Sequence, residues 1–391
     1  MNHSASPLAT HSSANLPWLD GLRGLAALWV LLHHIQILVG APHVAVVSWG
    51  ELAVDLFMLM SGFLMAHHYI ARKNSEPWNH SGTVLQFWLR RFFRIAPLYY
   101  LALLAALLLG PQMGQFRAEI ASVWPWTSSA PERYLDQSLE NILMHVSFLF
   151  GFSPYYAFRT ALPDWSIGLE MQFYLFFPFI MLLMARLSPL VATGVMVAIY
   201  MAARLLFRDF IHGFPMPAFL LLKLYVFLIG IWIAQARAER SMLRGLLAGV
   251  ALALLWMLLE RNVVAVARVA LVIALFYLMN NGTLPGSSLL AGATVRVRTM
   301  LSNRLAVFMG ETSYSVYLVH LLIVIPVSAL CSRHPGYLTL HAAARMAVVT
   351  AVALPISYLV GWVLFNTVEK KGIAAGKRLL HKLKMGRKVP A

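Results

Sequence analysis

The sequence predicts an all-α, polytopic membrane protein: a bundle of about ten transmembrane helices with both termini in the cytoplasm. Of its 391 residues, 60% are apolar and 12% are charged, whereas a soluble domain carries about a quarter charged residues. Apolar windows long enough to cross roughly 30 Å of hydrocarbon recur along the whole chain. The basic residues gather in short loops and at the C-terminal end, as they do in multi-pass membrane proteins.

The net charge of +16 follows from this topology. Eight of the 31 Lys and Arg residues lie between Lys370 and Lys388, and cytoplasmic segments collect such residues. No nucleic acid is expected as a partner, because no soluble domain is predicted to bind it. The single cysteine, Cys331, excludes an internal disulfide and a thiolate metal site, and no metal is expected.

Eleven apolar segments can be counted, and their positions can be read in chain order. They lie near 22–39, 52–70, 95–110, 139–153, 166–185, 190–206, 218–236, 243–259, 262–280, 313–331 and 346–368. The first 20 residues contain no Lys or Arg, so the first segment is interpreted as a retained span and not as a cleaved signal.

The distribution of basic residues places two parts of the chain in the cytoplasm, which limits how many of the eleven segments can cross the membrane. The basic linker 71–94 and the basic tail 370–391 both belong there, so the number of spans between them must be even. The segment 139–153 is the shortest and contains Asn141 and His145. It is predicted not to cross, which leaves ten spans in a single domain, 1–391, with a cytoplasmic segment at 1–20.

The first span contains two ionisable residues on one face. Arg23 and His34 are eleven residues apart in LRGLAALWVLLHH, which is about 20° more than three helical turns and about 16 Å along the axis. Arg23 alone could be a boundary cation, and His34 alone could be satisfied by a neighbouring helix. Ionisable groups at such depth are costly and usually functional.

The second span contains Asp55 in VDLFMLMSGFL. A carboxylate in hydrocarbon needs a cation or a hydrogen-bond donor. If the first two spans are antiparallel neighbours, Asp55 can reach the depth of His34 and orient its imidazole as a base. Lys223 and Arg268 are further charges within spans, and each could pair with Asp55, with Glu170 or with the other.

Three arginines precede the third span in RRFFRIAPLYY. Arg90, Arg91 and Arg94 could be a positive-inside anchor. Aromatic residues interleave them, however, and arginines with stacking partners at a membrane surface suit a phosphorylated, adenine-containing ligand.

Two later spans carry polar side chains near their beginnings. Glu170 in WSIGLEMQFYLFFP lies about one turn inside the fourth span and is expected near the outer mouth. Residue 169 is Leu, so a capping box with Ser166 does not account for the carboxylate of Glu170. In SYSVYLVH, Ser313, Tyr317 and His320 form one stripe of a helix.

These five stretches, in this order and over nearly the whole chain, resemble the signature motifs of the acyltransferase-3 family of membrane O-acyltransferases. The resemblance points to seven residues of this sequence: Arg23, His34, Asp55, Arg94, Glu170, Tyr317 and His320. Met58, Met60 and Ile167 depart from the usual family residues. Some relatives carry a hydrolase-like domain after the last span, whereas here only a basic stretch is expected there, so no self-contained second transfer step is expected.

The resemblance implies transfer of an acyl group, usually acetyl, from cytoplasmic acyl-CoA to a hydroxyl of a surface or exported glycan. This glycan could be a lipopolysaccharide, another polysaccharide or a lipid-linked saccharide. The protein would lie in a bacterial inner membrane among lipids, with acyl-CoA as a substrate and no bound cofactor. His34, Asp55 and Glu170 are the expected catalytic residues. Arg23, Arg90, Arg91 and Arg94 would bind the donor, and Glu170, Tyr317 and His320 the acceptor.

Two alternatives remain open. The acceptor could be a small hydroxylated metabolite such as a macrolide. In a different class, the same buried charges could line the path of a solute transporter.

Overall fold

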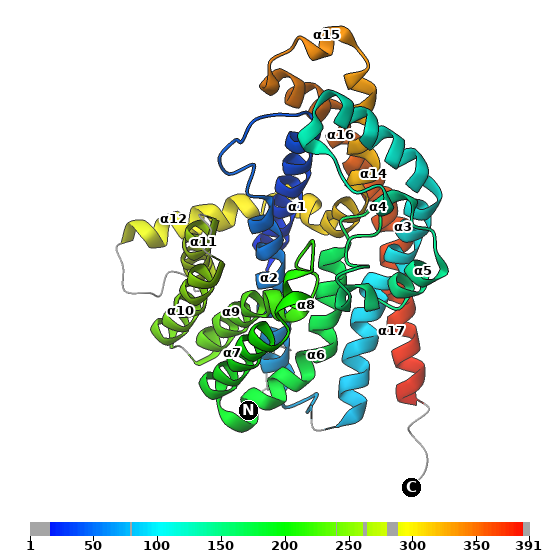
Figure 1. Cartoon of the computed structure of the whole chain (residues 1–391). Coiled ribbons are helices and arrows are strands. Elements are labelled where there is room, and N and C mark those ends of the chain that lie inside the picture. Colours follow the sequence, from blue (N-terminus) through cyan, green and yellow to red (C-terminus); the bar gives the residue numbers. More distant parts are fainter. Residues whose placement is uncertain (1–15, 79, 240, 261–263, 280–287, 386–391) are drawn as a thin grey trace, which may run out of the picture.

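Every regular element that the structure describes is a helix, as the composition predicted. The computed structural model (Figure 1) describes residues 16–78, 80–239, 241–260, 264–279 and 288–385. The expectations for residues 1–15 and 386–391 lie outside these ranges.

Nine helices of the described ranges are long and apolar enough to cross a membrane. They are α1 (Pro17–Leu38), α2 (Gly50–Arg72), α3 (Ser81–Val123), α6 (Trp165–Leu187), α7 (Pro189–Leu206), α9 (Leu220–Glu239), α10 (Met242–Glu260), α14 (Ser313–Ser332) and α16 (Ala342–Leu364). A shorter apolar helix, α11 (Val264–Met279), corresponds to the one remaining predicted span, at 262–280.

The segment at 139–153 is too short to cross. It forms α5 (Leu139–Val146) and the 3₁₀ turn η2 (Leu149–Phe152), and a helix of eight residues is about 12 Å long. Phe148, between the two, has a left-handed backbone with φ of 60°, which ends the helix. This agrees with the prediction from charge parity.

The third span is much longer than predicted. Hydropathy placed it at 95–110, but α3 has 43 residues and is about 64 Å long. The basic linker is therefore helical from Ser81 onward. Beside α3, the helix α16 continues through a π-helical turn, η3 (Phe365–Glu369), into α17 (Lys370–Met385). Both run along one side of the molecule (Figure 1).

Small residues set the spacing of the bundle at two contacts. On α2 and α9, a Cβ added at Gly62 would overlap the carbonyl of Phe227, and one added at Gly230 would overlap that of Leu59. The backbones of these helices therefore touch. On α17, Gly372 and Gly376 lie against side chains of α3.

The remaining elements connect the spans. They are η1 (Pro125–Thr127), α4 (Glu132–Leu135), α8 (Arg208–His212), α12 (Ser288–Leu301), α13 (Arg304–Glu311) and α15 (Pro335–Leu338). Among these, α4 and the residues just after it pack against the second half of α3. Tyr134 lies against Gly110 and Gly114, and Gln137 donates a hydrogen bond to the carbonyl of Leu107.

Candidate active site

A cavity of about 220 Å³ lies among α1, α2, α3, α6, α9 and α14 and brings together five of the predicted site residues. They are Arg23, Arg91, Arg94, Glu170 and Tyr317. Its walls also include Ser61, His68, Ser166 and Tyr174. Residues from six helices thus share one space, although the sequence places them up to 294 positions apart.

Three of the four predicted donor-binding arginines line the cavity. Arg91 lies 5.7 Å from the ring centre of Tyr174, and Arg94 donates to the carboxylate of Glu369. Arg23 is 3.8 Å from Asp20. Arg90 does not line the cavity. It points along another face of α3, because adjacent helical residues diverge by 100°, and it pairs with Glu76 at 3.0 Å.

The aromatic residues around the arginines play a different part from the one expected. Trp88, Phe92 and Phe93 are absent from the cavity wall, and Trp88 donates a hydrogen bond of 3.1 Å to the carbonyl of Tyr174. The rings that do line the cavity are those of Phe57, Tyr174, Phe227, Tyr314 and Tyr317.

Glu170 lies inside the cavity and not near an outer mouth. Its carboxylate accepts hydrogen bonds from Ser61, at 2.9 Å, and from the hydroxyl of Tyr174. The segment before α6 explains the difference. It folds back into the bundle, where the carbonyl of Pro163 accepts a bond of 3.0 Å from Tyr317. The helix therefore begins at depth, and Glu170 reaches the level of Ser61, the middle of α2.

His34 pairs with His320, and the predicted pair of His34 and Asp55 is not formed. Nε2 of His320 is 3.0 Å from Nδ1 of His34, and the ring centres are 4.9 Å apart. Each ring also bonds a carbonyl of its own helix: His34 that of Val30, at 2.9 Å, and His320 that of Tyr317, at 2.6 Å.

Asp55 instead joins three helices. It contacts Lys223 of α9 at 2.9 Å and Arg268 of α11 at 2.7 Å. All three side chains are 5% exposed or less. The rotation of α2 turns Asp55 toward these cations and away from α1. One of the pairings left open for Lys223 and Arg268, that with Asp55, is therefore the observed one.

Tyr317 connects the cavity with the histidines. Its hydroxyl lies at the cavity wall, 2.6 Å from that of Ser166. Its ring centre is 6.0 Å from that of His320. Neither histidine belongs to the cavity wall itself, so the histidine pair lies beyond Tyr317 as seen from the arginines.

Two polar groups near the site were missed by sequence reasoning. Glu369, in the π-helical turn, is buried and bonds Arg94 and Ser315, the latter at 2.9 Å. It stands just before the basic tail, and its only signal was an acidic residue in a basic stretch. π-helical turns often occur at functional positions.

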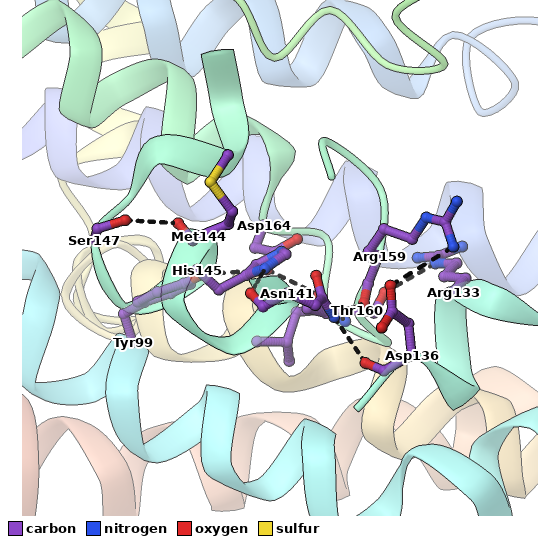
Figure 2. A network of polar contacts seen from close by, with 11 residues as sticks. Tyr99, Arg133, Asp136, Asn141, Met144, His145, Ser147, Arg159, Thr160 and Asp164 are labelled. Carbon is purple, nitrogen blue, oxygen red and sulfur yellow. Dashed lines mark hydrogen bonds and ion pairs between the residues drawn. The ribbon is translucent and has the colours of Figure 1, made fainter. Parts of the chain in front are cut away.

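The second group surrounds Asp164 (Figure 2). Asp164 accepts hydrogen bonds from Thr160, at 2.8 Å, and Tyr99, at 3.3 Å, and lies 3.7 Å from His145. The ring of His145 stacks on Phe150 at 4.3 Å. These contacts hold the segment before α6 within the bundle.

Comparison with known proteins gives a consistent result. The acyltransferase-3 family model, described as an acyltransferase domain, matches residues 16–362. Acyltransferase MdmB of Streptomyces mycarofaciens is 27% identical over 380 residues, 90% of each chain. O-acetyltransferase OatA of Staphylococcus aureus is 23% identical over 414 residues. That match covers 93% of this chain and 59% of OatA.

A third relative matches over part of its length. The putative membrane-bound transacylase BcsY of Komagataeibacter xylinus is 33% identical over 176 residues, which is 44% of this chain and 38% of BcsY. No solved structure matches.

Proposed function

Because this chain belongs to the acyltransferase-3 family and is a membrane O-acyltransferase, we propose that it moves an acetyl group from cytoplasmic acetyl-CoA to a hydroxyl of an exported or cell-surface glycan. The observation that supports this most is the position of the cavity. Its arginines share the cavity wall with Tyr317, whose ring centre is 6.0 Å from that of His320.

The arginines suit the donor. Acyl-CoA carries several phosphate charges, and guanidinium groups bind phosphate oxygens in pairs. Arg23, Arg91 and Arg94 supply three such groups at one cavity, and the rings of its wall can stack on the adenine. The thioester then extends toward Tyr317.

The hydrogen bonds of the histidine pair indicate which nitrogen acts as the base. If Nδ1 of His320 donates to the carbonyl of Tyr317, its Nε2 is an acceptor. Nδ1 of His34 then donates to it and to Val30. Nε2 of His34 thus carries a lone pair, and no described residue donates a hydrogen bond to it. His320 takes the orienting role that the sequence assigned to Asp55.

The reaction balances with these groups. Nε2 of His34 takes the proton of the acceptor hydroxyl, whose oxygen attacks the thioester carbon. The C–O bond forms, the C–S bond breaks, and the CoA thiolate leaves and is protonated. The protonated imidazole returns its proton to the departing sulfur or to water. Glu170 and Tyr317 line the path between donor and base.

Labelled donor tests the proposal directly. The protein, in lipid nanodiscs, is given acetyl-CoA with a ¹⁴C-acetyl group and a mixture of bacterial glycans. The expected result is a label released from the glycan by mild base, which cleaves O-esters, and absent with His34→Ala. Wild-type protein that leaves every glycan unlabelled would contradict the proposed acceptor. Label on a macrolide instead would favour the small-metabolite alternative.

A further inference from the structure

A second hollow, a groove of about 450 Å³, lies on the side of the protein away from the arginines. It is formed by α4, the start of α5 and the segment 155–159. The residues that matter here are Glu132, Asp136, Glu140, Tyr155, Tyr156 and Arg159.

The distance between the groove and the donor cavity follows from the length of α3, because this helix contacts both. Arg94 lines the cavity, whereas Gly110 and Gly114 of the same helix contact Tyr134, which belongs to α4 with Glu132. Sixteen to twenty helical residues separate these contacts, or about 24 to 30 Å. This is close to the thickness of the hydrocarbon layer. The groove therefore faces the side opposite to the one from which acyl-CoA enters.

The groove offers a ring face and unused hydrogen-bonding groups. Tyr155 is 58% exposed and meets the ring of Tyr156 edge to face at 4.8 Å. The guanidinium of Arg159 lies 3.9 Å from the ring centre of Tyr155 and 3.6 Å from Asp136. In the described part of the chain, the two Tyr hydroxyls and the carboxylates of Glu132 and Glu140 have no hydrogen-bond partner.

We propose that this groove binds the saccharide of the acceptor, and that this saccharide is neutral or carries an amine. The proposal rests on the function proposed above. Carboxylates and tyrosine hydroxyls bond sugar hydroxyls, and an exposed aromatic ring covers the apolar face of a pyranose. Three carboxylates beside one arginine leave a formal excess of two negative charges, which repels uronic acids and phosphorylated sugars.

A polar network leads from the groove to Asp164, just before α6, and Figure 2 shows Arg133, Thr160 and Asp164 within it. Arg133, next to Glu132, donates from Nε to the carbonyl of Thr160 at 3.0 Å and lies 3.8 Å from the ring centre of Phe158. The hydroxyl of Thr160 bonds Asp164.

The same network reaches the cavity wall and the histidine pair. Asp164 precedes α6, whose Ser166 bonds Tyr317. Tyr317 also contacts the histidine pair, since Nδ1 of His320 lies 2.6 Å from its carbonyl oxygen. A saccharide in the groove is thus held beside the network that ends at the proposed base.

Binding to defined saccharides tests the proposal. Nanodisc protein is applied to an array of chitotriose, maltotriose, the chitosan trimer and trigalacturonic acid. We expect the wild-type protein to be retained on a neutral or amine-bearing trimer and not on trigalacturonic acid. Tyr155→Ala should lower retention by about ten-fold or more, as expected for the loss of a stacking ring, and Tyr155→Trp should keep it.

The control is Glu119→Gln. Glu119 lies near the same end of α3 but outside the groove, where it pairs with Arg333 at 2.9 Å, and retention should not change. Preference for trigalacturonic acid, equal retention of Tyr155→Ala and wild-type protein, or no retention on any trimer would each overturn the proposal.

An assay with labelled acetyl-CoA distinguishes failure of the groove proposal from failure of the proposed transfer reaction. If a saccharide is retained through Tyr155 but never labelled, the groove binds it and the transfer reaction is wrong. If a glycan is labelled and Tyr155→Ala leaves its KM unchanged, the transfer reaction stands and the groove is not the acceptor site.

Discussion

Two histidines that are 286 residues apart share one hydrogen bond, which orients the ring of His34 through His320. A base held in this way needs no buried carboxylate. We therefore expect His34→Ala to lower kcat by about 100-fold or more, since a positioned base contributes at least that much, while the KM for acetyl-CoA stays the same. The measurement is steady-state transfer in nanodiscs, with His43→Ala in an exposed loop as the control. If the variant keeps more than about a tenth of the wild-type turnover, the substitution raises the activation barrier by less than roughly 1.4 kcal/mol. That result would rule out His34 as the base.

The two arginines Arg94 and Arg90 provide a matched pair for the donor site. Both belong to α3, but Arg94 lines the cavity and Arg90 pairs with Glu76 outside it. Lysine keeps the charge and the topology but loses the paired geometry of the guanidinium. Arg94→Lys should raise the KM for acetyl-CoA several-fold, Arg94→Ala should raise it further, and Arg90→Lys should have no effect. If Arg94→Lys and Arg90→Lys change the KM for acetyl-CoA equally, both arginines would be topological anchors and not donor-binding residues.

The segment that contains α5 is expected to have both of its ends on the same side of the membrane. A helix of eight residues cannot cross, so the residues before and after it must face the same side. Single cysteines at Ser128 and Tyr155, both exposed, are introduced into a Cys331→Ser background. Both should be labelled by an impermeant maleimide added to intact cells. Labelling of one only from inside would mean that the segment crosses.

Most membrane-spanning helices could be predicted, because the hydropathy of a segment depends only on residues that are consecutive in the sequence. The positions of the spans, the shortness of α5 and the common face of Arg23 and His34 need only length and period. The start of α3 at Ser81 could not be predicted in this way, because its polar first turns resemble a loop. The depth of Glu170 depends on the chain before α6, which returns into the bundle at Pro163.

Which charged residues on distant helices pair with each other could not be predicted from the sequence. Asp55 could reach either α1 or α9, and the choice is made by the rotation of α2. That rotation is fixed by the contact of Gly62 with Phe227. The sequence identified the charges of Asp55, Lys223 and Arg268 but could not choose among their possible partners, and it missed Glu369. Partners depend on the packing of helices that are far apart in the chain.

The buried triad of Asp55, Lys223 and Arg268 should stabilise the fold, and we expect its loss to be seen in folding before it is seen in chemistry. Asp55→Asn leaves two buried cations without their carboxylate, which costs about 3 to 5 kcal/mol. Thermal unfolding in nanodiscs should show a clearly lower Tm. Glu119→Gln, which breaks an exposed pair, should change stability by about 1 kcal/mol or less. A catalytic Asp55 would show the reverse pattern: an unchanged Tm with lost turnover.

The backbone contact between α2 and α9 also constrains how the cavity can move. Gly62 and Gly230 leave no space between these helices, and close-packed backbones slide or separate only at high cost. Ser61 and Phe227, which both line the cavity, therefore belong to one stiff wall. Widening of the cavity to admit a bulky donor and release the spent thiol is therefore expected at its other walls, which include α3 with Arg91 and Arg94. We expect Arg91 and Arg94 to shift with α3 relative to Ser61 and Phe227 when the donor enters.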